Sequence, residues 1–302
     1  MIILIAGGTG LVGAHLTSFF TADGHTVRLL SRTKQKHMLA EVFEWNIDKN
    51  YIDPEALNDV EVIINLAGAG VADRSWTSAR KKEIINSRID SIRCLKENLI
   101  AKGSKPNVII NASAIGYYGS LDFEKISYEN DEFGDTFLAE VCKKWENEAQ
   151  SLKKVCSRMI VCRIGVVLSN RGGALPKMMQ PIQYFVGSPL GSGQQIISWI
   201  HIEDLCRMIS FLVNKYKGDG IFNAVGHQSV TNKVLIKTIG KKLHRPIWLP
   251  NVPSIVLKLI LGEMAQIVLE GNVVSNQKIL NTGFEFKFET VSDALDDLLS
   301  DE

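Results

Sequence analysis

A glycine-rich turn near the N-terminus is the first feature that could do chemistry. Gly7, Gly8, Gly10 and Gly13 follow a short apolar run and precede a helical pattern, so both GxGxxG and GxxGxxG spacings are present. Glycines permit a tight turn and let a pyrophosphate approach the backbone closely. The free N–H groups and the dipole of the following helix would hold that anion. This context favours dinucleotide binding over a merely structural turn. The expected contact residues of the turn are Gly7, Thr9, Gly10, Leu11, Val12 and Gly13.

The end of the second apolar run indicates which dinucleotide is bound. An NAD site usually has an acidic residue about twenty residues beyond the glycine turn. Here the segment reads Ser31-Arg32-Thr33-Lys34, and no carboxylate lies between Asp23 and Glu41. An arginine can clasp a 2′-phosphate while neighbouring hydroxyls donate to it. We therefore predict NADP(H), held by Ser31 and Arg32. The alternative is that Arg32 and Lys34 are ordinary solvated charges.

Short apolar runs alternate with helical patterns through the first 165 residues. Near-continuous apolar strands need helices on both faces, so the pattern predicts an α/β fold with a doubly wound parallel sheet of the Rossmann type. We assign residues 1–165 to an NADP-binding domain. The expected strands are Ile2–Ala6, Thr26–Leu30, Val60–Leu66, Val108–Asn111 and Arg158–Arg163, with a weaker one near Val42–Trp45. The expected helices are Leu11–Ala22, Ser78–Ala101 and Thr136–Leu152, with a short one near Pro54–Asn58.

The pattern changes after about Gly165. Glycine and proline are dense from Gly172 to Gly193, which breaks regular structure repeatedly. We expect residues 166–302 to form a smaller C-terminal α/β domain on the substrate side, with strands around 195–224 as candidates to complete the first sheet. The elements expected there are a helix opened by the Asp204 region, a strand Ile221–Ala224, a helix Thr231–Leu243 capped by Thr231, and helices near Ile255–Leu269 and Val291–Leu299.

Composition excludes several classes of protein. The 302 residues carry 34 Lys and Arg against 33 Asp and Glu, a formal net charge of +1, and are 45% hydrophobic. This balance lacks the basic excess of a nucleic-acid binder, and the chain is too apolar to be disordered. Lys258 and Glu263 interrupt the most apolar late stretch, which argues against a membrane span. The five cysteines are dispersed, without metal-ligand spacing. We expect a cytoplasmic monomer or homodimer with reduced thiols, no metal, and no nucleic-acid or membrane partner.

Several strings resemble short-chain dehydrogenases/reductases of the extended type, in an atypical branch labelled "NAD-dependent epimerase/dehydratase". The strings are Asn65–Gly68, Asp73–Thr77, Asn86–Ile89, Asn111–Gly119, Phe137–Cys142 and Ser198–Leu205. The closing strings Trp248–Pro250, Leu261–Glu263 and Gly283–Phe286 resemble that branch's C-terminal domain of unassigned function. The resemblance covers almost the whole chain. It implies that Leu66, Ala67 and Gly68 line the adenine–ribose side, that Ser113 and Ala114 lie beside the nicotinamide ribose, and that Arg163 and Gly165 lie near the carboxamide.

The resemblance also reveals a departure in the active site. Ordinary members move a proton with the Tyr of a Tyr-x-x-x-Lys helix, assisted by Ser. With Glu146 as the register mark, Leu138 and Cys142 stand in the Tyr and Lys places, and Arg88 stands where a helix Asn is usual. Ser113 remains. The candidate catalytic residues are therefore Ser113, Arg88 and Tyr117.

Each candidate has a structural alternative. Tyr117 and Tyr118 can simply end a loop, Arg88 can be a solvated or ion-paired charge, and Cys142 can be a small buried hydrophobe. His201, before Glu203 and Asp204, is expected at a strand-to-helix junction capped by an acidic residue. Trp76 is expected to be a partly buried aromatic.

Two functions remain open from the sequence. The first is an NADP(H)-binding oxidoreductase or epimerase-like enzyme that acts on an unknown small molecule. The alternative is a catalytically weak NADP(H)-binding sensor or scaffold.

Overall fold

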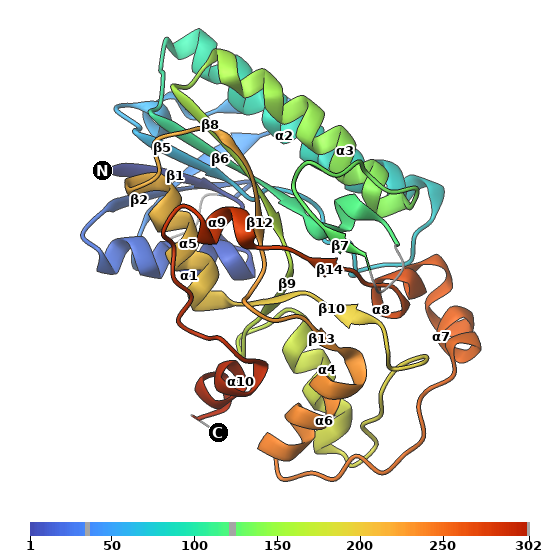
Figure 1. Ribbon diagram of the computed structural model, residues 1–302. Helices are drawn as coiled ribbons and strands as arrows, with labels where there is room; N and C mark the ends of the chain where they lie inside the picture. The colour runs from blue at the N-terminus through green and yellow to red at the C-terminus, as the bar shows by residue number, and fades with distance from the viewer. Residues whose placement is uncertain (34–36, 121–124, 301–302) are drawn as a thin grey trace.

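The computed structural model describes residues 1–33, 37–120 and 125–300, so Lys34 lies outside the described residues. A sheet in the order β12-β8-β6-β5-β1-β2-β3-β4 forms its centre (Figure 1). Its strand pairs are parallel except β3 with β4, which is antiparallel. The predicted doubly wound parallel sheet is confirmed. The strands are β1 (Ile2–Ala6), β2 (Thr26–Ser31), β3 (Glu41–Asn46), β4 (Tyr51–Ile52), β5 (Val62–Asn65), β6 (Val108–Ala114), β8 (Arg158–Ile164) and β12 (Gly220–Ala224).

Helices cover both faces of this sheet. On one face α2 (Ser78–Lys102) packs beside α3 (Phe137–Ala149), and on the other α1 (Leu11–Ala22) packs beside α5 (Ile202–Asn214) (Figure 1). Side chains alternate along β1: Ile3 and Ile5 enter the core under α1 and α5, whereas Leu4 enters the core under α2. A strand buried on both faces requires apolar residues at every position, which explains the continuous apolar run.

Only one of the later candidate strands completes the main sheet. Strand β12 pairs in parallel with β8, as the sequence allowed. Strands β10 (Ile196–Ile197) and β11 (Trp199–His201) pair instead with β13 (Val230–Thr231) and β9 (Val166–Leu168), outside that sheet. The second half of the chain therefore contributes an edge strand to the first half.

Helix α4 (Ala174–Gln183) lies in the stretch where glycine and proline indicated repeated breaks, so that expectation was wrong there. Pro176 occupies the first turn, where a backbone N–H has no acceptor within the helix. Pro181 removes one hydrogen bond later in the helix. The buried side chains of Leu175, Met179 and Ile182 recur at helical spacing, and their packing outweighs that loss.

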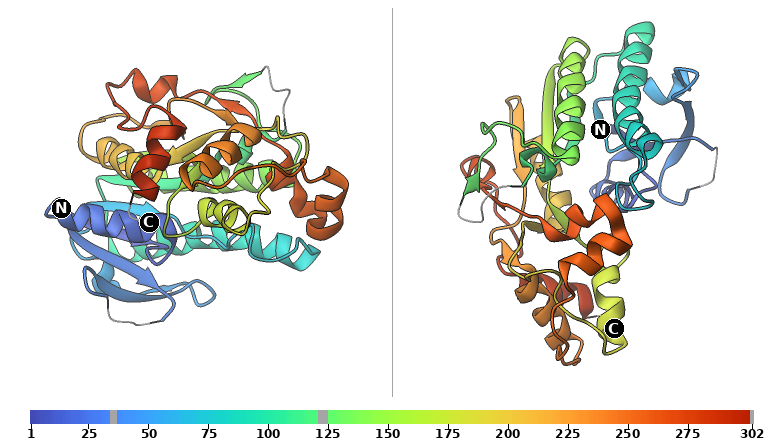
Figure 2. Two further views of the ribbon diagram at one scale, coloured as in Figure 1. Left: turned by 90° about the horizontal axis from the view of Figure 1, so that it is seen from below. Right: turned by 90° about the vertical axis from the view of Figure 1, so that its right-hand side faces the viewer.

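The remaining elements form a lobe on one side of the sheet, seen from two further sides in Figure 2. The expected helix over Ile255–Leu269 is interrupted at Gly262, whose φ of 58° lies in the left-handed region. The expected helix over Thr136–Leu152 likewise stops at Ala149 and continues as a 3₁₀ turn. The lobe's elements are α6 (Asn232–Lys242), α7 (Ser254–Leu261), α8 (Gln266–Leu269) and α10 (Val291–Leu299), with α9 (Gln277–Leu280) and the pair β7 (Ile126–Ser127) and β14 (Val273–Val274) beside β12.

Candidate dinucleotide-binding and active site

The turn between β1 and α1 is tight enough to require glycine at two positions. Gly7 has a φ of 80°, and a Cβ there would lie 3.0 Å from the carbonyl carbon and oxygen of Leu66. A Cβ on Gly13 would lie 2.4 Å from the carbonyl oxygen of Gly7. Gly10 precedes α1 without a side-chain cap, so the N–H groups of its first turn are not capped by that residue. The turn has the cradle that a pyrophosphate needs.

A cavity of about 620 Å³ opens beside this turn. It brings together three segments that the sequence predicted to share a ligand: the turn, the end of β2 and the end of β5. It is lined by Gly7, Thr9, Leu30, Ser31, Arg32, Thr33, Trp45, Ile47, Ala67, Gly68, Ala69, Glu83 and Ser87. The predicted residues Leu11, Val12 and Leu66 do not line the cavity. Val12 and Leu66 pack against the hydrophobic core, and Leu11 lies against the loop at Gly173.

Arg32 is the exposed cation at the outer end of this cavity. Among the described residues it forms no hydrogen bond or ion pair, so its guanidinium is available to a ligand. Glu83 lies across the cavity, and its pKa is held below the usual range by a hydrogen bond from Arg80 and by the charges of Arg80, Arg74 and Arg32. The arginines near the outer end of the cavity therefore outnumber its one carboxylate, and the local charge is positive.

A buried polar network lies where β6 and β8 finish, and none of its residues lines the cavity. We refer to this network as the inner end of the candidate site. Ser113 Oγ donates to Glu146 Oε1 at 2.6 Å. Arg163 donates to both oxygens of Glu146, from Nε at 2.8 Å and from its terminal nitrogen at 2.9 Å. Burial opposes the charge of Arg163, but the hydrogen bonds and charge of Glu146 outweigh it and raise the Arg163 pKa. The three side chains are held before any ligand arrives.

Two further residues extend this network toward β12. Arg163 donates to Tyr118 Oη at 3.0 Å, and Tyr118 in turn donates to Asn223 Oδ1 at 2.6 Å. Burial raises the pKa of Tyr118 to about 12, although Arg163 lowers it. The Tyr118 hydroxyl therefore stays protonated at neutral pH and links Arg163 to Asn223. Its neighbour Tyr117 places its ring centroid 3.5 Å from the Arg163 guanidinium, and its hydroxyl has no hydrogen-bond partner among the described residues.

Leu138 and Cys142 do face the loop after β6, as the register from Glu146 implies. A Cβ built on Gly116 would lie 3.3 Å from Leu138 Cβ and 4.0 Å from Cys142 Sγ. Leu138 packs in an apolar cluster with Trp76, which is buried. Burial raises the pKa of the Cys142 thiol to about 11, so it remains protonated at neutral pH. Neither side chain supplies a phenol or a cation at these places.

Arg88 is half-buried and forms no ion pair within the described residues. It donates to the carbonyl oxygens of Ala69 at 3.0 Å and Ile84 at 2.8 Å, and its Cζ lies 4.9 Å from the Trp145 ring centroid. Burial lowers its pKa, and its Nε is buried without a partner. A cation with spare donors thus stands beside the cavity wall at Gly68.

Comparison with known proteins identifies the family. Residues 3–225 match the model of the NAD dependent epimerase/dehydratase family, and residues 252–298 match a domain of unknown function, DUF1731. The chain belongs to the NAD dependent epimerase/dehydratase family. It is 36% identical over 299 residues to an epimerase family protein of Staphylococcus aureus, covering 98% of each chain. It is 38% identical to a chloroplastic SDR39U1 homolog of Arabidopsis thaliana, covering 98% of this chain and 86% of that one.

Solved structures place this family member among extended dehydrogenases/reductases. Human epimerase family protein SDR39U1, whose structure contains NADPH, superposes with a TM-score of 0.89 at 29% identity, with all of both chains covered. UDP-glucuronic acid 4-epimerase from Bacillus cereus, in complex with UDP-glucuronic acid and NAD, shares the fold alone, with a TM-score of 0.80 at 15% identity over 99% and 98% of the two chains. The resemblance stated from sequence motifs is confirmed.

Several lining residues of this epimerase/dehydratase family member were not predicted. Trp45 and Ile47 come from the end of β3, and Glu83 and Ser87 come from α2. The parallel pairing of β3 with β2 brings its end to the same edge of the sheet, so the weak strand signal near Trp45 could have suggested it. Predicted Gly165 is explained by packing, since a Cβ there would lie 2.5 Å from the Ser198 carbonyl oxygen.

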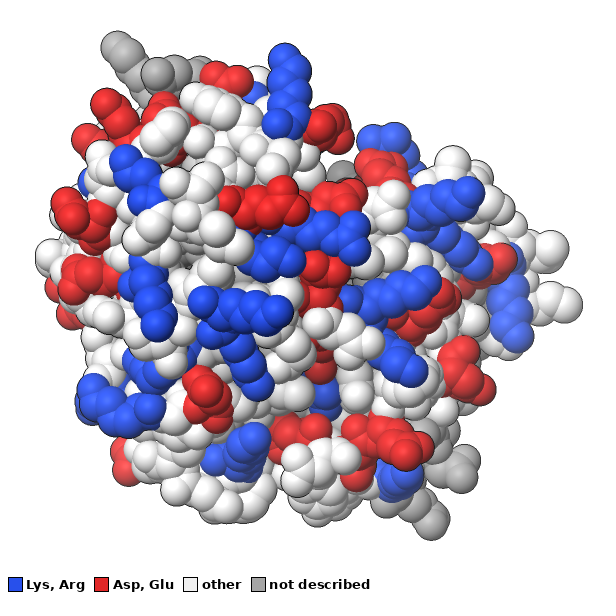
Figure 3. Space-filling model, turned by 90° about the horizontal axis from the view of Figure 1, so that it is seen from above, with Lys and Arg blue, Asp and Glu red and all other residues white. Residues whose placement is uncertain are grey.

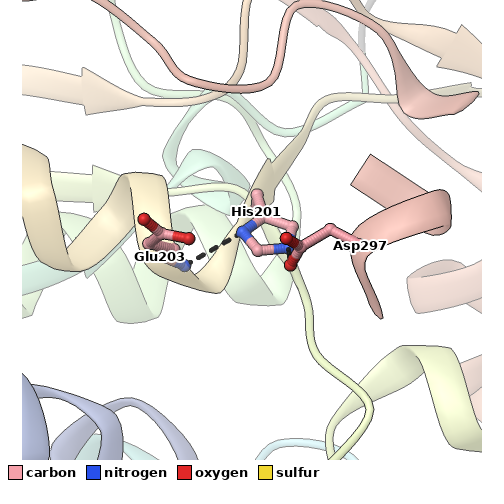
Figure 4. A group of neighbouring side chains, drawn as sticks. All are labelled: His201, Glu203 and Asp297. Atoms are coloured by element: carbon pink, nitrogen blue, oxygen red, sulfur yellow. Dashed lines mark hydrogen bonds and ion pairs between the residues drawn. The ribbon is translucent and has the colours of Figure 1, made fainter. Parts of the chain in front are cut away.

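His201, Glu203 and Asp297 form a group outside the dinucleotide site (Figure 4). His201 Nδ1 accepts from the Glu203 backbone N–H at 3.1 Å, so the histidine caps α5 and the expected acidic cap was wrong. Its proton therefore lies on Nε2, which is 3.3 Å from Asp297 Oδ2. Burial lowers the pKa of His201 more than the nearby carboxylates raise it. His201 therefore works as a helix cap.

A helix that spans a membrane must be both long and apolar. None of the helices that the structure describes is long and apolar enough to cross a membrane.

Proposed function

We propose that this chain is an NADP(H)-dependent oxidoreductase that acts on a small molecule. The observation that carries the proposal is one cavity that joins the glycine cradle to Arg32. The segment after β2 that carries Arg32 has no carboxylate between Asp23 and Glu41 to accept from a ribose hydroxyl. The NADPH in the human relative supports the same choice of cofactor. The cytoplasmic location, the monomeric or homodimeric state, and the absence of a nucleic-acid partner stay predictions.

The residues that line the cavity fit the phosphate-bearing part of such a cofactor. Arg32 and Ser31 would clasp the 2′-phosphate, because a guanidinium and a hydroxyl are its natural donors. The turn at Gly7 to Gly13 and the start of α1 would hold the pyrophosphate. Ala67 and Gly68 line the groove between these two points. When bound, the cofactor supplies or accepts a hydride at its nicotinamide end.

The inner network fixes what Ser113 can do. Its proton is donated to Glu146, so Ser113 Oγ can act toward the ribose or substrate only as a hydrogen-bond acceptor. Glu146 and Arg163 are positioning residues for that serine. Tyr117 is the candidate proton donor, because its hydroxyl has no partner among the described residues. Arg88 is the candidate for polarising a carbonyl or binding an acidic substrate, through its unused donors.

The sensor or scaffold function keeps one observation in its favour. Leu138 packs in an apolar cluster with Met264 and Ile267, which come from the C-terminal lobe. Such a cluster moves no proton. The two functions therefore differ in whether turnover accompanies binding.

Fluorescence titration of the protein with NADPH and NADH tests the cofactor choice. We expect tighter NADPH binding in the wild type. Arg32→Ala should weaken NADPH binding by about 10- to 100-fold, because it removes charge-assisted hydrogen bonds to the 2′-phosphate. NADH binding should not change. Arg74→Ala is the matched control, since Arg74 is an exposed cation near Glu83 that does not line the cavity. Equal affinities for the two cofactors would refute the assignment of Arg32.

A screen of small carbonyl and hydroxyl compounds, followed by NADPH absorbance, tests catalysis. Turnover that falls in Ser113→Ala, Arg88→Ala and Tyr117→Phe supports the enzyme. Turnover that none of these changes affects would place the chemistry elsewhere. Tight NADPH binding without turnover of any compound would favour the sensor or scaffold.

A further inference from the structure

Helix α7 exposes an apolar stripe to solvent. Ile255, Leu259 and Ile260 are 67%, 81% and 72% exposed, and Val256 lies beside them. These positions share one side of the helix, while Leu257 on the other side is buried. A contiguous exposed apolar stripe marks an interaction site more often than single exposed apolar residues do.

Further exposed aromatic residues lie in the same lobe and at the end of α4, which packs against α6. Trp248, 68% exposed, lies in the segment that runs from α6 to α7 (Figure 1). Tyr184 and Phe185 project at the end of α4, and the Arg245 guanidinium lies 4.7 Å from the Phe185 ring centroid. Figure 2 shows α4, α6 and α7 together on the side of the molecule away from β1–β4. Tryptophan and tyrosine with an apolar body and a polar edge are typical of the boundary between water and lipid.

The charge of one segment of this lobe, residues 220–262, has one sign, whereas α10 beside it carries Asp293, Asp296 and Asp297. From residue 220 to residue 262 the sequence contains no Asp or Glu. Its cations are Lys233, Lys237, Lys241, Lys242, Arg245 and Lys258. Within the described chain Lys242 pairs with Asp296, whereas the exposed Lys233, Lys237, Lys241 and Arg245 form no ion pair. The face seen from above, by contrast, intersperses both signs (Figure 3).

We propose that residues 231–261, the segment of this lobe that contains α6 and α7, dock on the surface of an anionic lipid bilayer. Helix α7 lies along the interface with its apolar stripe in the headgroup–acyl boundary, and the cations of α6 face the anionic headgroups. An eight-residue helix is about 12 Å long, so it cannot span the bilayer. In the sequence, Lys258 and Glu263 argue against a helix that spans the membrane, but they are compatible with a helix that lies on its surface. The contact revises the expectation of no membrane partner and does not depend on the cofactor.

Charge decides between a bilayer and a second copy of the chain. A twofold contact through the same patch would set the cations of one copy near those of the other. Like charges oppose that association, whereas phosphatidylglycerol headgroups neutralise the cations. The anionic bilayer is thus the occupant that satisfies both the apolar stripe and the charge.

Flotation of the full chain with vesicles tests the proposal. We expect binding to vesicles of phosphatidylcholine with phosphatidylglycerol, weaker binding to phosphatidylcholine alone, and loss of binding at high salt. The variant Leu259→Ser/Ile260→Ser should lose binding. Lys237→Glu/Lys241→Glu should weaken it by at least about 25-fold, from about fivefold for each cation removed. Both pairs are exposed, so circular dichroism should show native folding.

The matched control is Ile100→Ser, which removes an apolar side chain 61% exposed at the end of α2. It should bind vesicles as the wild type does. Absence of binding to phosphatidylglycerol vesicles, or equal loss in the control, would overturn the proposal. A homodimer in light scattering that Leu259→Ser/Ile260→Ser dissociates would also overturn it and assign the face to a second copy.

Discussion

The two ends of the proposed dinucleotide site are built differently. At the outer end Arg32 is exposed and forms no ion pair within the described residues. At the inner end Ser113, Glu146 and Arg163 are buried and bonded to one another. The outer end obtains its partner from the ligand, whereas the inner end is organised without one. Substitutions should therefore cost affinity at the outer end and folding stability at the inner end.

Glu146→Ala should produce the largest effect. It leaves the buried Arg163 guanidinium without its carboxylate, which destabilises a protein by about 3–5 kcal/mol. Glu140→Ala on the same helix is the control, because Glu140 pairs with Lys144 at the surface and should cost below about 1 kcal/mol. Urea unfolding measures both free energies.

A double variant sharpens this prediction. Glu146→Leu/Arg163→Leu removes both charges and should recover part of the loss. If Glu146→Ala costs no more than Glu140→Ala, the inner end is not held by its ion pair and the contrast between the two ends fails.

Gly13→Ala should have the next largest effect and act at the outer end. Its Cβ would meet the Gly7 carbonyl oxygen at 2.4 Å, so the turn must shift. We expect a loss of about 1–3 kcal/mol in unfolding free energy and a loss of NADPH affinity. Gly103→Ala is the control, because Gly103 has a φ of 69° but lies at the far end of α2 with open space around it. It should reduce stability without changing the affinity measured by titration. Unchanged affinity in Gly13→Ala would contradict the cradle.

The same contrast explains how far the sequence predicted the site. The outer end depends on local signals, since the glycine turn and Ser31-Arg32 each lie within a few residues of a strand end. The inner end depends on contacts between distant residues: Ser113 with Glu146 across 33 positions, and Tyr118 with Asn223 across 105. No periodicity encodes such pairs. Helix α4 was missed for a related reason, because tertiary packing outweighed its prolines.

His201 tests whether burial away from the groove also creates pH dependence. Burial lowers the pKa of His201 in the folded protein below the ordinary value of 6.5, and the charge of Lys287 lowers it further. The charges of Asp297, Asp204 and Glu203 raise it, but by less. The unfolded chain then takes up the proton first, so stability is present above about pH 6.5 and is lost as the pH falls toward the folded pKa. His201→Asn keeps a cap for α5 but has no titrating group. Urea midpoints from about pH 8 to about pH 5.5 should therefore fall less in the variant. Parallel pH profiles would contradict the burial of a neutral imidazole.

The smallest expected effect concerns the cysteines, whose thiols should not react with a disulfide reagent in the native protein. The five cysteines are all buried, and burial raises the pKa of Cys142 to about 11. A thiol that stays protonated and shielded is a poor nucleophile. A coloured disulfide reagent should therefore label almost no thiol in the native protein and five in urea, with NADPH making no difference. If Cys142 alone reacts in the native state and NADPH protects it, the inner end opens to solvent. Cys142 would then join Ser113, Arg88 and Tyr117 as a candidate for the chemistry.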